Sequence, residues 1–160
     1  MLKDKIIVAT QWLVLLISCS SAIEARAELK ICSQAEAITA EESASLIRTA
    51  RDLFQAYKQY SHCDDGGIAE GYSESVARLL EDHWDRLSDL YNYTKSDKAF
   101  EAFVIRHVDA TISLKDSRSI YANARSNCPA YAHRLCSRIE NTLSKWPLIT
   151  APNFKPTIIP

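Results

Sequence analysis

The sequence predicts an all-α protein: a compact bundle of about five helices, cross-linked by two disulfides and followed by a Pro-rich C-terminal tail. Apolar residues recur at three- and four-residue steps along most of the chain, whereas the alternation typical of strands is almost absent. Four cysteines remain once the N-terminal segment is set aside, and an even number suits a disulfide framework. The length of 160 residues favours one domain, which we place at 28–146, between a signal peptide at 1–27 and the tail at 147–160.

The N-terminal segment has the layout of a secretory signal peptide. Two lysines precede an apolar run from Ile6 to Ile17, and small residues follow it. The run is shorter than the roughly 20 apolar residues that a membrane span needs. We therefore expect an extracytoplasmic location, most simply a bacterial periplasm, with cleavage after Ala22 or after Ala27.

Two other fates of this segment remain open. The tetrapeptide Leu16-Ile17-Ser18-Cys19 is similar to the lipobox of bacterial lipoproteins, in which Cys19 would become a lipidated N-terminus. In the second alternative, the segment stays uncleaved and serves as an anchor. We expect contact with a membrane only if Cys19 is lipidated.

Charge patterning argues against a nucleic-acid partner. The formal net charge is −1 at pH 7, and no run of lysine and arginine is present. Loss of residues 1–27 would make the chain slightly more acidic, so attraction to an anionic surface is not expected.

The first two helices are predicted from a capping sequence and from two apolar stripes. Thr39, followed three residues later by Glu42, predicts the start of a first helix that ends near Ser61. The chain's three glycines come next within a short stretch, and residues 63–67 are predicted to form the main turn. A second helix is expected over about 73–90.

Three further helices are expected in the second half of the chain. Ser96 or Asp97 caps the third helix, and the fourth spans about Leu114–Ser126 and ends at Asn127. Pro129 suits the first position of a fifth helix. That helix should end before Pro147, which begins a tail with four of the five prolines and an extended backbone.

These helices restrict the disulfide pairing of Cys32, Cys63, Cys128 and Cys136. Cys128 and Cys136 are expected at the start of and within the fifth helix, which would separate their Cα atoms by roughly 12 Å. A disulfide needs less than about 7 Å. We therefore expect these two not to pair with each other, and each to reach Cys32 or Cys63. Both remaining connectivities tie the last helix to the first helix and its Gly-rich exit.

No metal, cofactor or catalytic motif is expected from the sequence. The polar cluster around the glycines has adjacent aspartates rather than the alternate ligands of a calcium loop, and a disulfide would remove Cys63 as a zinc ligand. The histidines offer only a weaker alternative, a hydrolase that uses His107 with Asp109, or His83 with Asp85.

A binding surface is the favoured interpretation of the Gly-rich turn. Tyrosines flank the turn, and tyrosine is common in interfaces because it combines apolar area with a polar tip. Loops on a rigid frame often carry recognition. The candidate binding residues are His62, Asp64, Asp65, Gly66, Gly67, Glu70 and Tyr72.

Three segments carry a resemblance to a known family. They are Cys63-Asp64-Asp65-Gly66-Gly67-Ile68-Ala69-Glu70-Gly71-Tyr72-Ser73, Phe103-Val104-Ile105-Arg106-His107-Val108-Asp109-Ala110-Thr111, and Cys128-Pro129 with Leu135-Cys136. From about Phe54 to Leu143 the chain resembles a family of uncharacterised exported bacterial proteins. The resemblance implies a bacterial, extracytoplasmic setting and brings no activity or catalytic residue.

The sequence thus favours a small exported helical protein that acts by binding a protein partner, as periplasmic inhibitors and immunity-type proteins do. One alternative is a structural or accessory protein of the envelope, anchored through Cys19. The other alternative is the hydrolase with His/Asp pairs.

Overall fold

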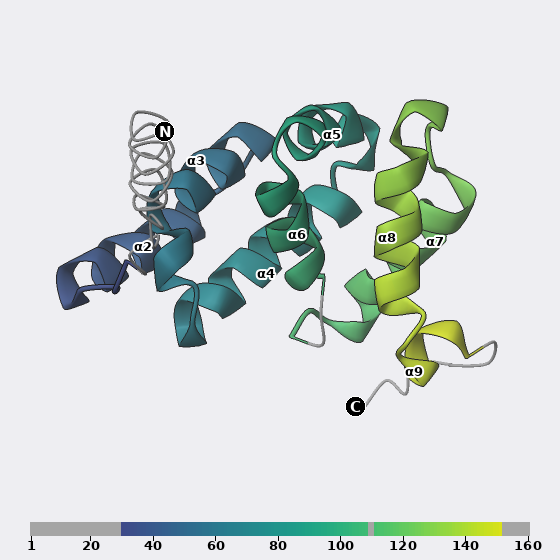
Figure 1. Cartoon of the computed structure of the whole chain (residues 1–160). Helices are drawn as coiled ribbons and strands as arrows, with labels where there is room; N and C mark the ends of the chain where they lie inside the picture. The colour runs from purple at the N-terminus through teal and green to yellow at the C-terminus, as the bar shows by residue number, and fades with distance from the viewer. Residues whose placement is uncertain (1–29, 109–110, 152–160) are drawn as a thin grey trace, which may run out of the picture. The chain divides into compact units, whose positions relative to one another are not determined.

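The computed structural model describes residues 30–108 and 111–151 of the chain (Figure 1). The predicted signal peptide, Cys19, and the tail beyond Ala151 lie outside these residues. Contacts divide the chain into units at 1–30 and 31–160, and the fold below is that of the second unit. Its described residues form eight α-helices, three short 3₁₀ helices and no strand, which confirms the all-α class.

The predicted first helix is in fact two helices, α2 (Gln34–Leu46) and α3 (Ala50–Tyr60). Each has its own capping box, formed by Ser33 with Glu36 and by Thr49 with Asp52. The prediction of a start at Thr39 is wrong, because its hydroxyl donates to the carbonyl of Ala35 within α2. A helix-interior threonine can bond in this way instead of capping.

The predicted Gly-rich turn is mostly the first part of a helix. After the 3₁₀ helix η1 (Ser61–Cys63), α4 spans Gly66–Glu81, so it begins earlier than the expected residue 73. Asp65 is the N-cap, and its carboxylate accepts a hydrogen bond from the Gly66 amide. Gly66 has φ of 52°, which favours glycine, and it therefore makes the sharp entry into α4.

The predicted second helix also breaks in two. α4 ends at Glu81, and η2 (Trp84–Arg86) leads into α5 (Leu87–Ser96). The Trp84 indole N–H donates to the carbonyl of Asn127, which ties this break to a distant part of the chain. α6 (Lys98–Arg106) then begins after Asp97, as predicted, with the Asp97 carboxylate accepting from the Phe100 amide.

The remaining helices follow the sequence more closely. α7 (Leu114–Ser126) has the predicted bounds, and Asn127 is its C-cap. The next segment is the 3₁₀ helix η3 (Ala130–Ala132), and α8 spans His133–Leu143. Pro147 begins the short helix α9 (Pro147–Thr150), so the start of the predicted extended tail is helical.

The disulfides are Cys32–Cys63 and Cys128–Cys136, and the predicted exclusion of a Cys128–Cys136 pair is wrong. The exclusion assumed that both residues lie in one helix. Pro129 has extended backbone angles and η3 follows it, so α8 begins only at His133. The Cα atoms of Cys128 and Cys136 are consequently 6.1 Å apart, within the range that a disulfide allows.

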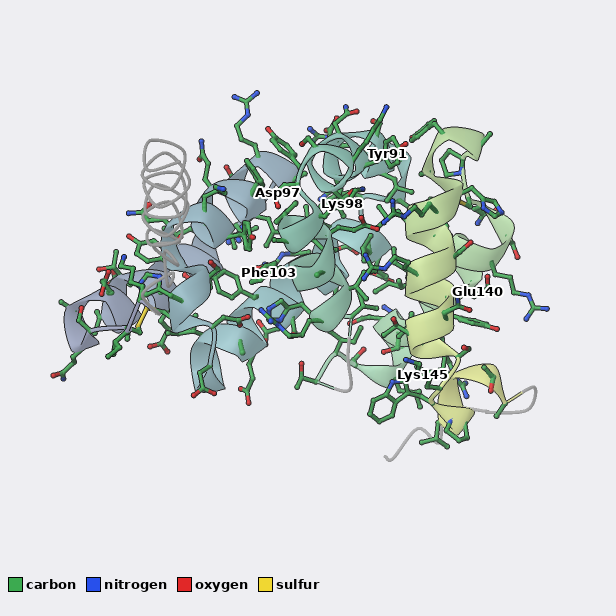
Figure 2. All side chains as sticks on the ribbon, viewed as in Figure 1. Tyr91, Asp97, Lys98, Phe103, Glu140 and Lys145 are labelled. Carbon is green, nitrogen blue, oxygen red and sulfur yellow. A yellow bond between two sulfur atoms is a disulfide. The ribbon has the colours of Figure 1, made fainter. Side chains whose placement is uncertain are left out.

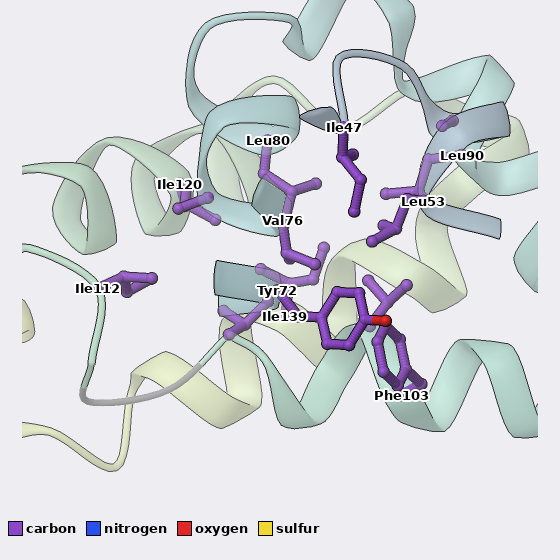
Figure 3. Close-up of a cluster of buried hydrophobic side chains, with 14 of the residues drawn as sticks. Ile47, Leu53, Tyr72, Val76, Leu80, Leu90, Phe103, Ile112, Ile120 and Ile139 are labelled. Carbon is purple, nitrogen blue, oxygen red and sulfur yellow. The ribbon is translucent and has the colours of Figure 1, made fainter. Parts of the chain in front are cut away.

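A continuous core joins the helices of this unit. α2 packs on α4, α4 on α7, and α7 on α8. Gly71 permits the first of these contacts, because a Cβ there would lie 3.1 Å from the Ala44 Cβ. Figure 3 shows Tyr72 and Phe103 among the aliphatic side chains of the core, and their ring centroids are 5.1 Å apart.

Candidate functional site

The structure separates the predicted binding residues into an exposed group and a buried group. Asp65, Gly66, Gly67 and Glu70 are exposed at the start of α4. Asp64 and Tyr72, by contrast, have buried side chains.

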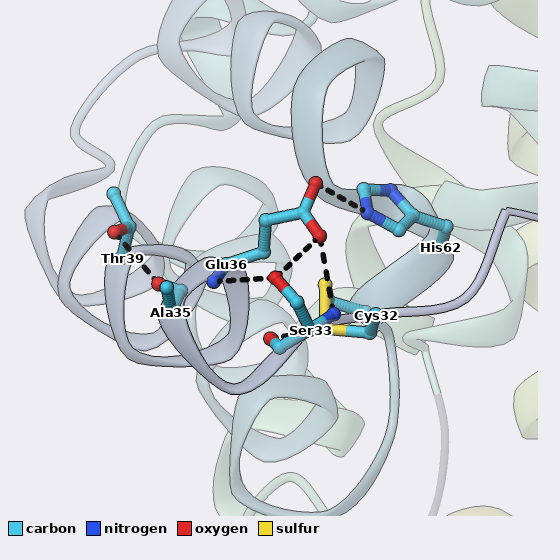
Figure 4. Close-up of a disulfide and its surroundings, with 7 residues drawn as sticks. Cys32, Ser33, Ala35, Glu36, Thr39 and His62 are labelled. Atoms are coloured by element: carbon cyan, nitrogen blue, oxygen red, sulfur yellow. Dashed lines mark hydrogen bonds and ion pairs between the residues drawn. A yellow bond between two sulfur atoms is a disulfide. The ribbon is translucent and has the colours of Figure 1, made fainter.

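His62 takes part in a local polar cluster rather than in an open surface. Its Nε2 lies 3.3 Å from Glu36 Oε1 (Figure 4). Glu36 also accepts from the amide and hydroxyl of Ser33, next to the Cys32–Cys63 disulfide. The cluster therefore fixes η1 against the start of α2.

Asp64 belongs to a buried polar network with Ser73 and His107. Nε2 of His107 lies 3.2 Å from Oδ2 of Asp64, and Nδ1 lies 3.0 Å from the Ser73 hydroxyl oxygen. In a neutral ring Nε2–H donates to Asp64 and Nδ1 accepts from Ser73, whereas an imidazolium donates to both. Ser73 and His107 are each only 2% exposed.

Arg106 adds a cation at the surface end of this network. Its guanidinium donates to Oδ2 of Asp64 and lies over the Phe103 ring. Burial alone would raise the pKa of Asp64, but the hydrogen bonds and charges of His107 and Arg106 outweigh burial and hold this pKa below its ordinary value. Asp64 is therefore a buried carboxylate that stays ionised because of these two neighbours.

Two buried oxygens beside this network have no hydrogen-bond partner among the described residues: Oδ1 of Asp64 and the Tyr72 hydroxyl. Burial and then the negative charge of Asp64 raise the pKa of Tyr72 to about 12. The phenol therefore keeps its proton across the physiological range.

The three side chains are the residue types of a nucleophilic triad, but their arrangement differs from that of a serine hydrolase. In such enzymes the carboxylate bonds Nδ1 and the serine bonds Nε2. Here the two nitrogens have the opposite partners. The serine is also almost wholly enclosed, so a substrate cannot reach it without movement of the helices.

The predicted hydrolase pairs do not form a comparable site. His83 and Asp85 are exposed around η2. Asp109 lies outside the described residues, and the carboxylate beside His107 is Asp64.

A second charged cluster links α6 to α8. Glu101 is 3% exposed and receives three cations: Lys98 Nζ at 3.0 Å and Arg134 at 3.3 Å on Oε2, and Arg138 at 2.8 Å on Oε1. Burial would raise the pKa of Glu101, but its hydrogen bonds to Arg138 and Lys98 and their charges hold this pKa below its ordinary value. We call Lys98, Glu101, Arg134 and Arg138 the Glu101 cluster.

Neither network was found from the sequence. Ser73, Arg106 and the Asp64–His107 pair come from segments far apart in the chain, and no local pattern joins them. For Glu101 the sequence does contain a local signal. This acidic residue lies beside Phe100 and one turn before Val104, on the apolar face of its helix. A buried carboxylate of this kind requires cationic partners.

The described residues are also informative about metal sites and membrane spans. No group of three or more histidine, cysteine, aspartate or glutamate side chains there is placed to hold a metal ion. None of the helices in residues 30–108 and 111–151 has the length and apolar character of a membrane span.

Comparison with known proteins gives no match to a family model, to a curated protein or to a solved structure. The resemblance to exported bacterial proteins therefore stays a prediction.

Proposed function

We propose that the protein is exported and acts by binding another protein, in the manner of a small periplasmic inhibitor or immunity-type protein. The proposal rests on one observation: some polar side chains are enclosed and others are exposed. The groups suited to chemistry, Ser73, His107 and Asp64, are enclosed and bonded to each other. Polar groups suited to recognition stand exposed on the same frame.

The start of α4 supports this proposal through its rigidity. The Cys32–Cys63 disulfide ends one residue before Asp64, and the Asp65 amide donates to the Cys63 carbonyl at 2.9 Å. The backbone of exposed Asp65 is thus tied to the disulfide-bonded Cys63, and exposed Glu70 lies on the helix that Asp65 caps. A surface that is ordered before binding loses less conformational entropy in a complex.

The test is capture of a partner from the envelope fraction with the exported protein and a double variant, Asp65→Asn with Glu70→Gln. Both side chains are exposed, so the fold should persist. The matched control is Glu41→Gln with Glu42→Gln on the exposed side of α2. We expect the α4 variant, and not the control, to lose a partner that crosslinks to the unaltered protein. Identical capture by all three proteins would exclude this surface, and no specific capture by any would contradict a binding function.

Hydrolysis is the second candidate function, because the Ser73–His107–Asp64 hydrogen-bond chain contains the residue types of a nucleophilic triad, although in reversed order on the imidazole. The test is covalent labelling of the intact protein by a fluorophosphonate, with Ser73→Ala as the control. Labelling that depends on Ser73 would support an activated serine. Absence of labelling in the folded protein would favour a purely structural role for the network.

A further inference from the structure

We propose that the Glu101 cluster binds carboxylate groups of an acidic segment of a protein partner. The inference rests on the proposed binding function, since the occupant is a protein, and it adds the chemical class of the partner and a second contact surface.

The Glu101 cluster has an excess of positive charge at one point. Lys98, Arg134 and Arg138 all approach a single carboxylate, so the cluster carries two uncompensated positive charges. A guanidinium has more N–H donors than it can direct at one oxygen. The side chains of Lys98, Arg134 and Arg138 are 55%, 67% and 37% exposed, so their remaining donors are accessible to an approaching anion.

The cations of the Glu101 cluster are already positioned before a ligand binds. Glu101 lies inside the molecule at the junction of α6 and α8, and both of its oxygens are used as acceptors. Lys98 is also held by the Thr94 carbonyl at 3.3 Å. Long cationic side chains lose entropy when a ligand fixes them, and this cluster has incurred much of that cost before binding.

An aromatic pair lies near the start of α8, the helix that carries Arg134 and Arg138. Tyr131 precedes Arg134 by three residues, is 50% exposed, and its ring lies 5.4 Å from that of Tyr91 on α5. The ammonium of Lys95 lies 5.9 Å from the Tyr91 ring centroid. Exposed tyrosine beside arginine is the composition that dominates binding energy in protein interfaces.

These features favour a protein carboxylate over a nucleic acid or a bilayer. A polyanion or an anionic membrane is attracted by an extended basic surface. This chain has a net charge of −1 and no basic run, so its positive site is local. A local pair of arginines suits the bidentate geometry of a carboxylate.

The test is an NMR titration of the exported, ¹⁵N-labelled protein, purified with both disulfides formed, with a hexaglutamate peptide at low ionic strength. We expect saturable shifts that centre on Lys98, Arg134 and Arg138 and weaken as salt is added. Hexalysine and hexaglutamine peptides should not produce them.

The variant for this test is Lys98→Gln with Arg134→Gln. It leaves the Arg138–Glu101 pair in place, so Glu101 is not left without a cation. The control is Lys145→Gln, which removes one exposed positive charge beyond the opposite end of α8 (Figure 2). We expect at least a fivefold loss of hexaglutamate affinity in the double variant and no more than a twofold change in the control. Thermal unfolding of each protein verifies the fold.

Two results would overturn the proposal: no shifts at these residues, or equal affinity in the double variant and the control. Binding to phosphatidylglycerol vesicles could instead be stronger than binding to hexaglutamate and depend on Lys98 and Arg134. That result would assign the cluster to a membrane. If the Lys98/Arg134 variant still captures the partner and hexaglutamate causes no shifts, this inference is wrong. The proposed binding function would still stand.

Discussion

Asp64 shows how a single residue couples the fold to pH. Its carboxylate is buried, and its pKa is held below the ordinary 3.8 by His107 and Arg106. A carboxyl with a lower pKa in the folded than in the unfolded state stabilises the fold above its unfolded pKa. This contribution is lost as the pH falls from about 3.8 through the lower pKa of Asp64 in the folded state. Over this range the Asp64 carboxylate takes up a proton in the unfolded chain before it does so in the folded protein.

We predict that Asp64→Asn lowers the free energy of unfolding at pH 7 by about 3 kcal/mol, since it leaves His107 and Arg106 without their anion. The variant should also lose less stability than the unaltered protein between pH 4 and the acid limit, although Glu101 keeps part of the dependence. Urea unfolding across this range measures both effects. Equal acid sensitivity of the two proteins would show that Asp64 is not one of the responsible groups.

At the scale of elements, Gly71 and Gly67 separate two roles of glycine within α4. Gly71 faces α2, where an added Cβ would lie 3.1 Å from Ala44, whereas nothing lies within 4 Å of a Cβ at Gly67. We predict that Gly71→Val destabilises the protein by about 2 kcal/mol through overpacking. Gly67→Ala should be neutral or stabilising by up to about 1 kcal/mol, because alanine favours the helix.

Thermal and urea unfolding of the two glycine variants measure these changes. An unchanged Gly71→Val would contradict the close packing of α4 against α2, and a destabilised Gly67→Ala would contradict the open, helical position of Gly67.

Elements defined by local signals could be predicted from the sequence, and elements defined by tertiary contacts could not. α7 and the start of α6 follow from caps and stripes that lie within their own segments. The break at Thr49 also has a local capping box, which was missed because the apolar stripe continues through it. The break after α4 has no side-chain cap, and one of its contacts is to Asn127, far along the chain.

The same division applies to the candidate sites. The glycines indicated a special segment, but Asp64 and Tyr72 turn inward because Phe103 lies on α6 and His107 lies at its C-cap. No spacing rule connects residues from separate helices before their packing is known.

At the scale of the whole molecule, the two disulfides act over very different loop lengths. Cys32–Cys63 spans 31 residues and joins the chain before α2 to η1, whereas Cys128–Cys136 spans 8 residues and joins the chain after α7 to α8. In the chain-entropy account, the longer loop contributes about 3.5 kcal/mol and the shorter about 2.5 kcal/mol. Replacing Cys32 and Cys63 by alanine should therefore cost more stability than replacing Cys128 and Cys136.

Urea unfolding of the two double variants gives their order, and non-reducing peptide mapping gives the pairing directly. Four free thiols in the native protein would contradict both the fold's cross-links and the proposed oxidising compartment.

Export itself is tested at the mature N-terminus. A signal peptidase acting after Ala22 or Ala27 leaves a chain that begins at Ile23 or Glu28, a few residues before Cys32 and the disulfide that holds α2 to η1. We predict one of these two N-termini in protein recovered from outside the cytosol, and intact-mass spectrometry distinguishes them. A diacylglyceryl mass on Cys19 would instead support the envelope-anchored alternative. A protein that still begins at Met1 would contradict cleavage. Recovery of that uncleaved protein in soluble form would also contradict an uncleaved membrane anchor.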